Sequence, residues 1–399
     1  MTTKRAGRLA IDGGAPVRTT FLPYARQTIE AEDEAAVLAA LRSDWLTTGP
    51  RIRELEVALE EVTGARHAVL FSSGTAALHG AMAVLDIAPG DEVVTTPMTF
   101  SATANATLYV GGEVRFADVR PDTLLLDPDA VRTATTPRTR AIVATDYAGQ
   151  PADYGALRSV AEAAPGGPVA LVADAAHSLG GSRAGVRVGQ LADMTILSLH
   201  PAKIVTTGEG GAVLTDRDEW PERLRRFRNH GISTELGARR DWRYDLVELG
   251  YNYRLTDIGA ALGLAQLGRL ERFITRRQAI AARYREAFAG EERFDLPVTD
   301  PDVEHARHLY VVQLRLDRLG VDRAAVYAAM KAEGIGVNVH YIPVHQLSLY
   351  RERYPDVSMP VADAAYERML TLPLFPAMTD GDVDDVVAAM TKVLDAYPR

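Results

Sequence analysis

Apolar residues along the first two thirds of the chain alternate between two spacings. Helical spacing, with charges between the apolar positions, predicts helices over residues 31–41, 52–62, 76–85 and 101–109. Short apolar runs that end at small, polar or proline residues predict strands over 67–71, 92–95, 114–117, 141–145, 168–173, 195–199 and 212–215. Strands that are apolar on both faces and alternate with helices favour an α/β fold, in which helices cover a mostly parallel sheet.

The last third of the chain has a different pattern. A long helical pattern over 256–288 predicts a helix that links two domains. Beyond it we expect strands near 310–316 and 336–340 and helices near 323–332, 361–370 and 380–396. The predicted organisation is an N-terminal arm (1–23), a large α/β domain (24–250), and the linking helix with a small C-terminal α+β domain (251–399).

Composition and charge exclude several classes of protein. The 399 residues include 44 Lys+Arg and 53 Asp+Glu, a net charge of −9, which argues against nucleic acid or an anionic membrane as a partner. The chain has no Cys, so thiolate metal sites, disulfides and cysteine nucleophiles are excluded. No apolar run has the length of a signal peptide core or a membrane span. We therefore expect a cytoplasmic protein.

A small polar turn lies between the first predicted strand and the helix after it. It reads Ser73-Gly74-Thr75-Ala76. Free amides at a helix N-terminus bind phosphate well, and glycine allows the ligand close to the backbone. An ordinary helix cap by Ser73 or Thr75 explains the same residues equally well.

An acidic residue, Asp174, follows the apolar run 168–173. A carboxylate at the end of a buried strand needs a cation or a hydrogen-bond donor, because an isolated buried charge is costly. A protonated heteroaromatic nitrogen would serve, and His177 could face the same ligand. A capping Asp with a core His is the simpler alternative for these two residues alone.

A lysine, Lys203, follows the next predicted strand. Pro201 keeps the segment out of a helix, and a lysine with a lowered pKa beside a cavity can form a Schiff base with a carbonyl compound. The alternative is a solvated surface lysine, although the apolar neighbours Ile204 and Val205 favour partial burial. A phosphate turn, then Asp174, then Lys203, 29 residues later (203 − 174), is the order that a pyridoxal phosphate site requires.

Seven motifs in order support this interpretation. They are Trp45-Leu46-Thr47-Thr48-Gly49-Pro50, Ser72-Ser73-Gly74-Thr75-Ala76-Ala77-Leu78, Thr99-Phe100-Ser101-Ala102-Thr103-Ala104-Asn105, Asp174-Ala175-Ala176-His177, Ser198-Leu199-His200-Pro201-Ala202-Lys203, Gly208-Glu209-Gly210-Gly211 and Gly250-Tyr251-Asn252-Tyr253-Arg254. With these motifs, nearly the whole chain resembles the sugar aminotransferases of the DegT/DnrJ/EryC1/StrS type, a branch of the fold-type I pyridoxal phosphate enzymes.

The resemblance implies a cofactor, pyridoxal 5'-phosphate, held in the 24–250 domain, and a role for each matching residue. Lys203 would carry the cofactor as a Schiff base and move the proton, and Asp174 would keep the ring nitrogen protonated. The other implied cofactor contacts are Gly74, Thr75, Ala76 and Ser198 at the phosphate, Phe100 stacked on the ring, and His177 near its 3-oxygen. A core position is the alternative for Phe100. Asn252 would reach the cofactor phosphate of a second subunit, which implies a homodimer with shared active sites.

The segment 338–345 resembles the part of this family that shapes the sugar pocket, in particular in enzymes for UDP-linked 4-keto sugars. His340, Tyr341 and His345 are the expected substrate contacts. These histidines could suggest a metal site, as could the pair at 305 and 308. We expect no metal, because the five-residue step from 340 to 345 does not share a helical face and no carboxylate cluster accompanies it.

The expected activity is transfer of an amino group from an amino acid, with L-glutamate as the expected donor, to the ketone of a nucleotide-linked 4-keto-6-deoxy sugar. A family variant with histidine in place of the lysine performs dehydration, and Lys203 disfavours it. Residues 9–18 resemble a branch that acts on a free cyclitol ketone such as an inosose, and this alternative stays open. So does a non-catalytic binding protein on the same fold. A nicotinamide dehydrogenase is disfavoured because no G-x-G-x-x-G opens the first helix of the sheet.

Overall fold

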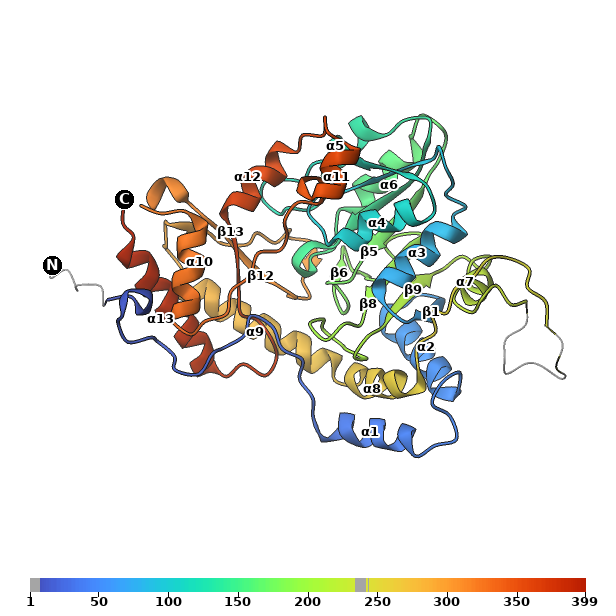
Figure 1. Ribbon diagram of the computed structural model, residues 1–399, viewed down its shortest axis with the longest axis horizontal. Helices are drawn as coiled ribbons and strands as arrows, with labels where there is room; N and C mark the ends of the chain where they lie inside the picture. Colours follow the sequence, from blue (N-terminus) through green and yellow to red (C-terminus); the bar gives the residue numbers. More distant parts are fainter. Residues whose placement is uncertain (1–7, 234–241, 243) are drawn as a thin grey trace.

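A seven-stranded sheet forms the centre of the larger part of the molecule (Figure 1). The computed structural model describes residues 8–233, 242 and 244–399. The strands are β1 (His67–Phe71), β2 (Glu92–Thr95), β3 (Glu113–Phe116), β4 (Thr139–Thr145), β5 (Ala170–Asp174), β8 (Met194–Ser198) and β9 (Gly211–Thr215), in the order β1-β9-β8-β5-β4-β2-β3. Five neighbouring strands, β3, β2, β4, β5 and β8, are parallel to one another. β9 runs antiparallel to both of its neighbours, β1 and β8. The predicted α/β fold with a mostly parallel sheet is confirmed.

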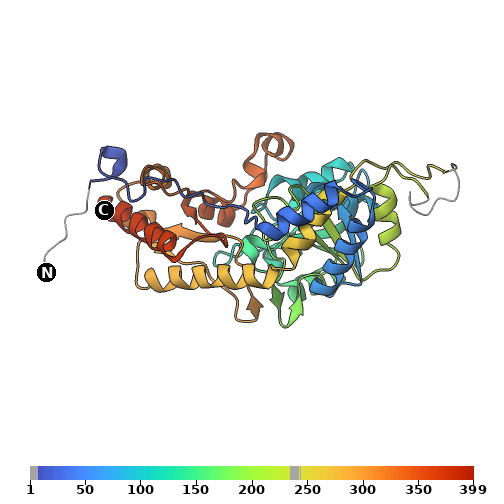
Figure 2. The same ribbon diagram turned by 90° about the horizontal axis from the view of Figure 1, so that it is seen from below.

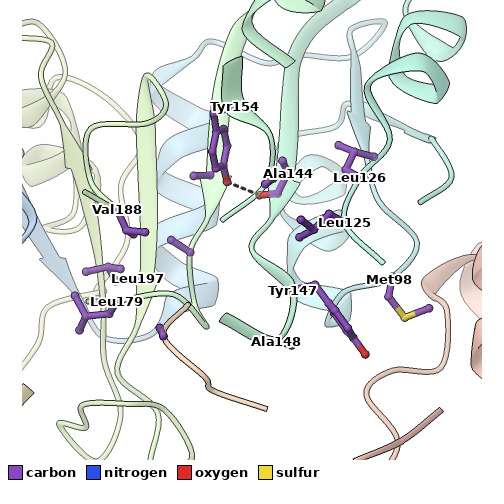
Figure 3. Packing of buried hydrophobic residues seen from close by; sticks show 14 of the residues in the cluster. Met98, Leu125, Leu126, Ala144, Tyr147, Ala148, Tyr154, Leu179, Val188 and Leu197 are labelled. Atoms are coloured by element: carbon purple, nitrogen blue, oxygen red, sulfur yellow. Dashed lines mark hydrogen bonds between the residues drawn. The ribbon is translucent and has the colours of Figure 1, made fainter. Parts of the chain in front are cut away.

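Helices cover both faces of this sheet. One face carries α3 (Gly74–Val84), α4 (Ser101–Tyr109) and α7 (Pro221–Phe227), and the other carries α2 (Pro50–Thr63), α5 (Pro128–Ala134) and α6 (Tyr154–Glu162). Successive strand residues point to opposite faces, so Val69 packs in the α3 core and Leu70 in the α2 core. Figure 3 shows part of the α2 core, where the Tyr154 hydroxyl lies 3.4 Å from the Ala144 carbonyl oxygen. Burial on both faces is why the strands are continuous apolar runs.

A smaller unit contains most of the C-terminal third. Its antiparallel sheet of β10 (Phe294–Asp295), β12 (Tyr310–Leu314) and β13 (Met369–Leu372) packs with α9 (Leu270–Ala287), α10 (Arg323–Ala332) and α13 (Asp380–Ala396). The N-terminal segment, which includes the short helix η1 (Ala10–Asp12), lies along this unit (Figure 2). Leu9 and Leu22 are buried in its core, and Leu22 pairs with Ile335.

The remaining elements connect these two parts. β6 (Ser182–Arg183) and β7 (Val186–Arg187) form a hairpin, and β11 (Val303–Glu304) pairs with β6. α1 (Ala31–Leu41) and α8 (Asp257–Leu267) pack together beside α2. α11 (Ser348–Arg353) and α12 (Pro360–Arg368) precede β13, and single turns of 3-10 helix lie at Tyr147–Gly149, Leu316–Arg318 and Val344–Gln346. Among the described residues, no helix is long and apolar enough to span a membrane.

The single long helix predicted over 256–288 is wrong, because α8 and α9 are separate. Gly268 ends α8, and Arg269 departs from helical geometry with φ −114° and ψ 11°. The Arg269 guanidinium pairs with Glu30 at 2.8 Å and with Asp33, both at the start of α1. These ion pairs across the fold hold the break, and the local pattern contains no sign of them.

Two predicted elements near the C-terminus also differ. Residues 336–340 form no strand, only an isolated bridge between Asn338 and Thr371. The Asn338 side chain accepts a hydrogen bond from the Val339 amide at 2.8 Å, a local turn that competes with a strand ladder. The helix predicted over 361–370 ends at Arg368, because the next residues pair with β12 as β13. The domain limits proposed from the sequence stay a prediction.

Candidate active site

A cavity of about 520 Å³ lies at the carboxyl ends of β4, β5 and β8. Thr145, Asp174 and Ser198, the last residues of these strands, line it. The N-terminal turn of α3 and the segment 338–341 also contribute to its wall. Ligands of parallel α/β sheets gather at this edge. The structure therefore brings together the predicted phosphate turn, acid and amine, which are far apart in the sequence.

Asp174 is buried, with 5% of its surface exposed. Its carboxylate accepts a hydrogen bond of 2.6 Å from the Thr103 hydroxyl and one of 3.2 Å from the Ala176 amide. Burial raises the pKa of Asp174, while these two donors and the nearby positive charge of Lys203 lower it. A cationic group in the cavity would favour the ionised carboxylate further.

Lys203 lies in the turn after β8, where its amide donates to the His200 carbonyl at 2.9 Å. Burial of its amine lowers the pKa of Lys203 to about 8, although the Asp174 carboxylate acts in the opposite direction. A large share of the amine is therefore unprotonated at a slightly alkaline pH, which a nucleophile or a base requires. Lys203 is not the solvated surface lysine of the simpler alternative.

The start of α3 forms a tight polar turn on one side of the cavity. The Ser73 hydroxyl accepts from the Ala76 amide at 3.0 Å, so the predicted helix cap exists. The amides of Gly74 and Thr75 belong to the first helical turn and have no acceptor within the helix. A Cβ on Gly74 would lie 3.0 Å from the Cβ of Ser198. A side chain at this position would therefore be in tight contact with Ser198 at the end of β8.

His177, His308 and His340 contribute imidazole rings to the cavity wall. The rings of His177 and His308 are 4.4 Å apart, and the Tyr341 hydroxyl lies 2.9 Å from Nε2 of His177. Burial and the charge of Lys203 lower the pKa values of His177, His308 and His340, the last to about 4, so these rings are neutral. Nδ1 of His177 is buried with no hydrogen-bond partner among the described residues.

The predicted site residues do not all line this cavity. Phe100 does, and its side chain is 61% exposed, so it is not a core residue. Ala76 lies behind the turn and is buried. His345 lies apart from the cavity lining, where Nε2 is 3.0 Å from the Asp363 carboxylate. Asn252 is exposed outside the lining, at a bridge with Asn229.

Several lining residues were not predicted from the sequence. Tyr24, Thr99, Thr103, Thr145, Glu209 and His308 contribute to the cavity wall. Thr99 and Thr103 fall inside a motif quoted above, and their spacing of four residues at the start of a helix was an available signal. Tyr24 and His308 come from segments whose sequence gives no sign of proximity to β5.

A second buried carboxylate, Asp146, lies directly after β4. It accepts hydrogen bonds from the Ala152 amide at 2.9 Å, the Tyr154 hydroxyl at 2.7 Å and the Ser178 hydroxyl at 2.5 Å. Burial raises its pKa to about 7, against these donors. Its amide donates to the Asp174 carbonyl at 3.0 Å, so it fixes the backbone beside the cavity. In the part of the chain that the structure describes, no group of three or more His, Asp and Glu could hold a metal ion.

Comparison with known proteins now decides the family. The model of the DegT/DnrJ/EryC1/StrS aminotransferase family matches residues 27–391. The chain belongs to this family. It is a pyridoxal phosphate-dependent sugar aminotransferase, and the resemblance inferred from the sequence is confirmed.

Solved structures of this family superimpose over nearly the whole chain. A proposed sugar aminotransferase from Streptococcus pneumoniae, known in PMP and PLP forms, is 32% identical in its PMP form, with a TM-score of 0.89 over 94% of this chain and 99% of that one. PseC of Helicobacter pylori, an aminotransferase of pseudoaminic acid biosynthesis, is 29% identical, with a TM-score of 0.88 over 95% and 100%. DesV of S. venezuelae is 33% identical, with a TM-score of 0.82 over 90% and 93%.

The residues of the cavity fit the cofactor of this family. The cavity offers an amine at Lys203, a buried carboxylate at Asp174, a glycine turn with free amides at Gly74 and a buried ring nitrogen without a partner at His177. Pyridoxal phosphate carries an aldehyde, a basic ring nitrogen, a phosphate and a ring oxygen, and each has a matching group here.

Proposed function

We propose that the enzyme moves the amino group of an amino acid, L-glutamate, to the ketone of a nucleotide-linked 4-keto-6-deoxy sugar. The observation that carries the proposal is the pair of Lys203 and Asp174 at adjoining strand ends in one cavity, with the α3 turn in the same wall. When bound, pyridoxal phosphate supplies an aldehyde that combines with amines and a ring that accepts an electron pair.

Asp174 and Lys203 carry the acid–base chemistry in this proposal. The ionised Asp174 carboxylate would keep the ring nitrogen of the cofactor protonated, which makes the ring a better electron acceptor. Nζ of Lys203 would hold the cofactor through its aldehyde and would serve as the base for the proton of the substrate carbon. An amine with a pKa of about 8 suits both tasks, because it can be deprotonated and reprotonated at a pH near neutrality.

The remaining cavity residues bind and orient. Gly74, Thr75 and Ser198 hold the phosphate, with Ala76 behind them in the first turn of α3. Phe100, exposed at the start of α4, stacks on the ring, since a flat aromatic face orients a planar ligand at low entropic cost. The buried Nδ1 of His177, which has no partner among the described residues, would bind the ring oxygen.

The segment 338–341 contacts the sugar in this proposal. His340 and Tyr341 line the cavity, and their rings lie beside one another at 5.0 Å. The rings of Tyr341 and Phe100 are 6.3 Å apart, so the two residues are close enough to face one substrate. His345 packs on Phe116 instead, and we assign the contact to His340 and Tyr341 alone.

A substrate panel tests the proposal. The purified enzyme is incubated with glutamate and nucleotide-linked 4-keto sugars, 3-keto sugars or scyllo-inosose, and 2-oxoglutarate is measured. We expect turnover with a 4-keto-6-deoxy nucleotide sugar. Turnover with the inosose alone would assign the enzyme to the cyclitol branch, and no 2-oxoglutarate with any acceptor would contradict glutamate as the donor.

The Lys203→Ala variant tests the anchoring amine. It should fold with an unchanged melting temperature, bind pyridoxal phosphate without a covalent link and show no transamination. Borohydride treatment of the loaded variant should leave the protein mass unchanged, whereas it fixes the cofactor to the native enzyme. A cofactor adduct on the variant would contradict the role of Lys203.

We also propose a homodimer with shared active sites, in which Asn252 binds the phosphate held by a second copy. Its support is that Asn252 is exposed and lies outside the cavity of its own chain. Mixed dimers of Asn252→Ala and Lys203→Ala chains contain one complete site and one that lacks both groups. Activity should therefore recover to one working site per dimer, and activity no higher than that of the two separate variants would refute sharing. The cytoplasmic location stays a prediction.

A further inference from the structure

Three buried threonine hydroxyls form a hydrogen-bonded row that ends on Asp174. Thr145 ends β4, Thr99 lies between β2 and α4, and Thr103 lies in the first turn of α4. The Thr145 and Thr99 hydroxyls are 3.0 Å apart, those of Thr99 and Thr103 are 2.7 Å apart, and Thr103 donates to Asp174 at 2.6 Å. At most 3% of the surface of each threonine is exposed.

The row has one direction when Asp174 is ionised. A hydroxyl has a single proton to donate, and Thr103 donates its proton to the Asp174 carboxylate. Thr99 must therefore donate to Thr103, and Thr145 to Thr99. Each hydroxyl that receives a hydrogen bond becomes a better donor, so the row strengthens the last bond.

We propose that the row Thr145, Thr99 and Thr103 keeps Asp174 ionised inside the protein, with Thr103 as a positioning residue of the active site. A buried carboxylate favours its neutral form unless donors stabilise the charge. Apart from Thr103, the hydrogen-bond donor to this carboxylate among the described residues is the Ala176 amide, at 3.2 Å. The 2.6 Å bond from Thr103 lies in the range of a hydroxyl that donates to an ionised carboxylate.

The consequence for the reaction rests on the proposed function of Asp174. An ionised, weakly basic carboxylate leaves the shared proton on the ring nitrogen of the cofactor. Without Thr103 the carboxylate becomes more basic and draws that proton to itself, which weakens the ring as an electron acceptor. The ionisation itself does not depend on the cofactor, so it can be tested in its absence.

Four other ionisable groups act on Asp174 and must be kept constant in such a test. Lys203 is the cation that acts on Asp174, and the Asp146 carboxylate repels the Asp174 carboxylate. The Tyr154 and Tyr341 hydroxyls interact with it electrostatically. The test variants leave all four in place.

The first experiment uses the cofactor-free protein. The infrared C=O band of the protonated Asp174 carboxyl group is assigned with Asp174→Asn and followed against pH. Thr103→Val should raise its midpoint by about one pH unit, as expected for loss of a hydrogen bond to a charge. Thr99→Val should raise it by less, because Thr103 then still donates, and Thr103→Ser should restore the native midpoint.

A matched control lies one helical turn further along α4. The Thr107 hydroxyl is buried and has no hydrogen-bond partner among the described residues, so Thr107→Val removes a hydroxyl from the same helix without touching the row. It should leave the Asp174 midpoint unchanged. Equal midpoints for Thr103→Val and Thr107→Val would overturn the proposal. If Thr103→Val does not fold, Thr103→Ala removes the same hydroxyl without added bulk and must move the midpoint in the same direction.

The second experiment uses the loaded enzyme and separates this inference from the proposed function. Thr103→Val should change the visible absorption of the bound cofactor and lower kcat about tenfold, with little change in KM. A shifted Asp174 midpoint in the cofactor-free protein, together with native absorption and kcat, would support the hydroxyl row and overturn the role assigned to Asp174.

Discussion

The pKa of the Lys203 amine should lie far below that of an ordinary lysine, and the charge of Asp174 should influence its value. Burial lowers the pKa of Lys203 from 10.5 to about 8, and the negative charge of Asp174 limits the fall. Asp174→Asn removes that charge and keeps the size of the side chain. We therefore expect the variant to have a Lys203 pKa below 8, with more free amine at neutral pH.

The size of the effect follows from these values. At pH 8, about half of the Lys203 amine is free, whereas a lysine with the ordinary pKa of 10.5 has only about 0.3% in that form. The ratio is about 160. A difference of 2.5 pKa units (10.5 − 8) corresponds to about 3 kcal/mol between the protonated and free forms. If Asp174→Asn lowers the pKa by about one further unit, roughly nine tenths of the amine is free at pH 8.

The composition of the chain makes this measurable. It contains four lysines, at positions 4, 203, 331 and 392. Cofactor-free protein is reductively methylated with formaldehyde and cyanoborohydride for short times between pH 6 and 10, and the rate at each lysine is measured by peptide mass spectrometry. The midpoint for Lys203 should lie near 8 in the native protein and lower in Asp174→Asn.

Lys331 provides the internal control, because it is exposed on α10 and remote from the cavity. Its rate profile should be identical in the two proteins. A native Lys203 midpoint at or above 10 would refute the burial argument. A midpoint that rises in Asp174→Asn would refute the sign of the interaction between the two groups.

Three further predictions concern the walls of the site. Phe100→Ala should leave the free energy of unfolding within about 0.5 kcal/mol of the native value, because the ring is exposed. It should weaken the binding of pyridoxal phosphate, as measured by equilibrium dialysis. An equal loss of stability and affinity would contradict the assignment of Phe100 to the cofactor. Gly211→Ala places a Cβ 2.5 Å from the Ser73 backbone, and should displace the α3 turn and cost about 1–3 kcal/mol in denaturant unfolding; an unchanged midpoint would show that the turn can move. Asp146, with a folded pKa of about 7 and an ordinary value of 3.8, binds a proton in the folded state that the unfolded chain has lost, so its contribution lowers stability as pH rises from about 4 to 7. Asp146→Asn should remove this pH dependence of the free energy of unfolding, measured across that range. Ser178→Ala keeps the Asp146 carboxylate and should keep the pH dependence.

The sequence predicted the strands of the large sheet well because burial on both faces leaves a simple signal. Apolar runs ended at Asp174 and just before the Lys203 turn, and strands that are parallel neighbours bring such ends to one edge. The cofactor side of the site was therefore accessible from short segments. The break at Arg269 could not be predicted in this way, because a single glycine inside a helical pattern is tolerated. The ion-pair partners of Arg269 lie more than two hundred residues away in the sequence.

The second half of the cavity depended on packing between distant segments. Thr103 reaches Asp174 across 71 residues of sequence, and Tyr341 reaches His177 across 164. Neither pair has a local pattern that would indicate contact. His345 shows the converse, since it lies four residues from Tyr341 in the sequence but turns toward Asp363 and away from the cavity. Neighbourhood in the sequence is a poor guide where the chain leaves regular elements.

The N-terminal segment binds the C-terminal unit through specific contacts. The amides of Ala10 and Val17 donate to the Glu333 carboxylate, and Arg18 pairs with Asp382 and Asp385 on α13. Residues 9–22 therefore leave the ribosome before any of their packing partners have been made. Their contacts with the Glu333 carboxylate and with α13 can form only after more than three hundred further residues have been translated.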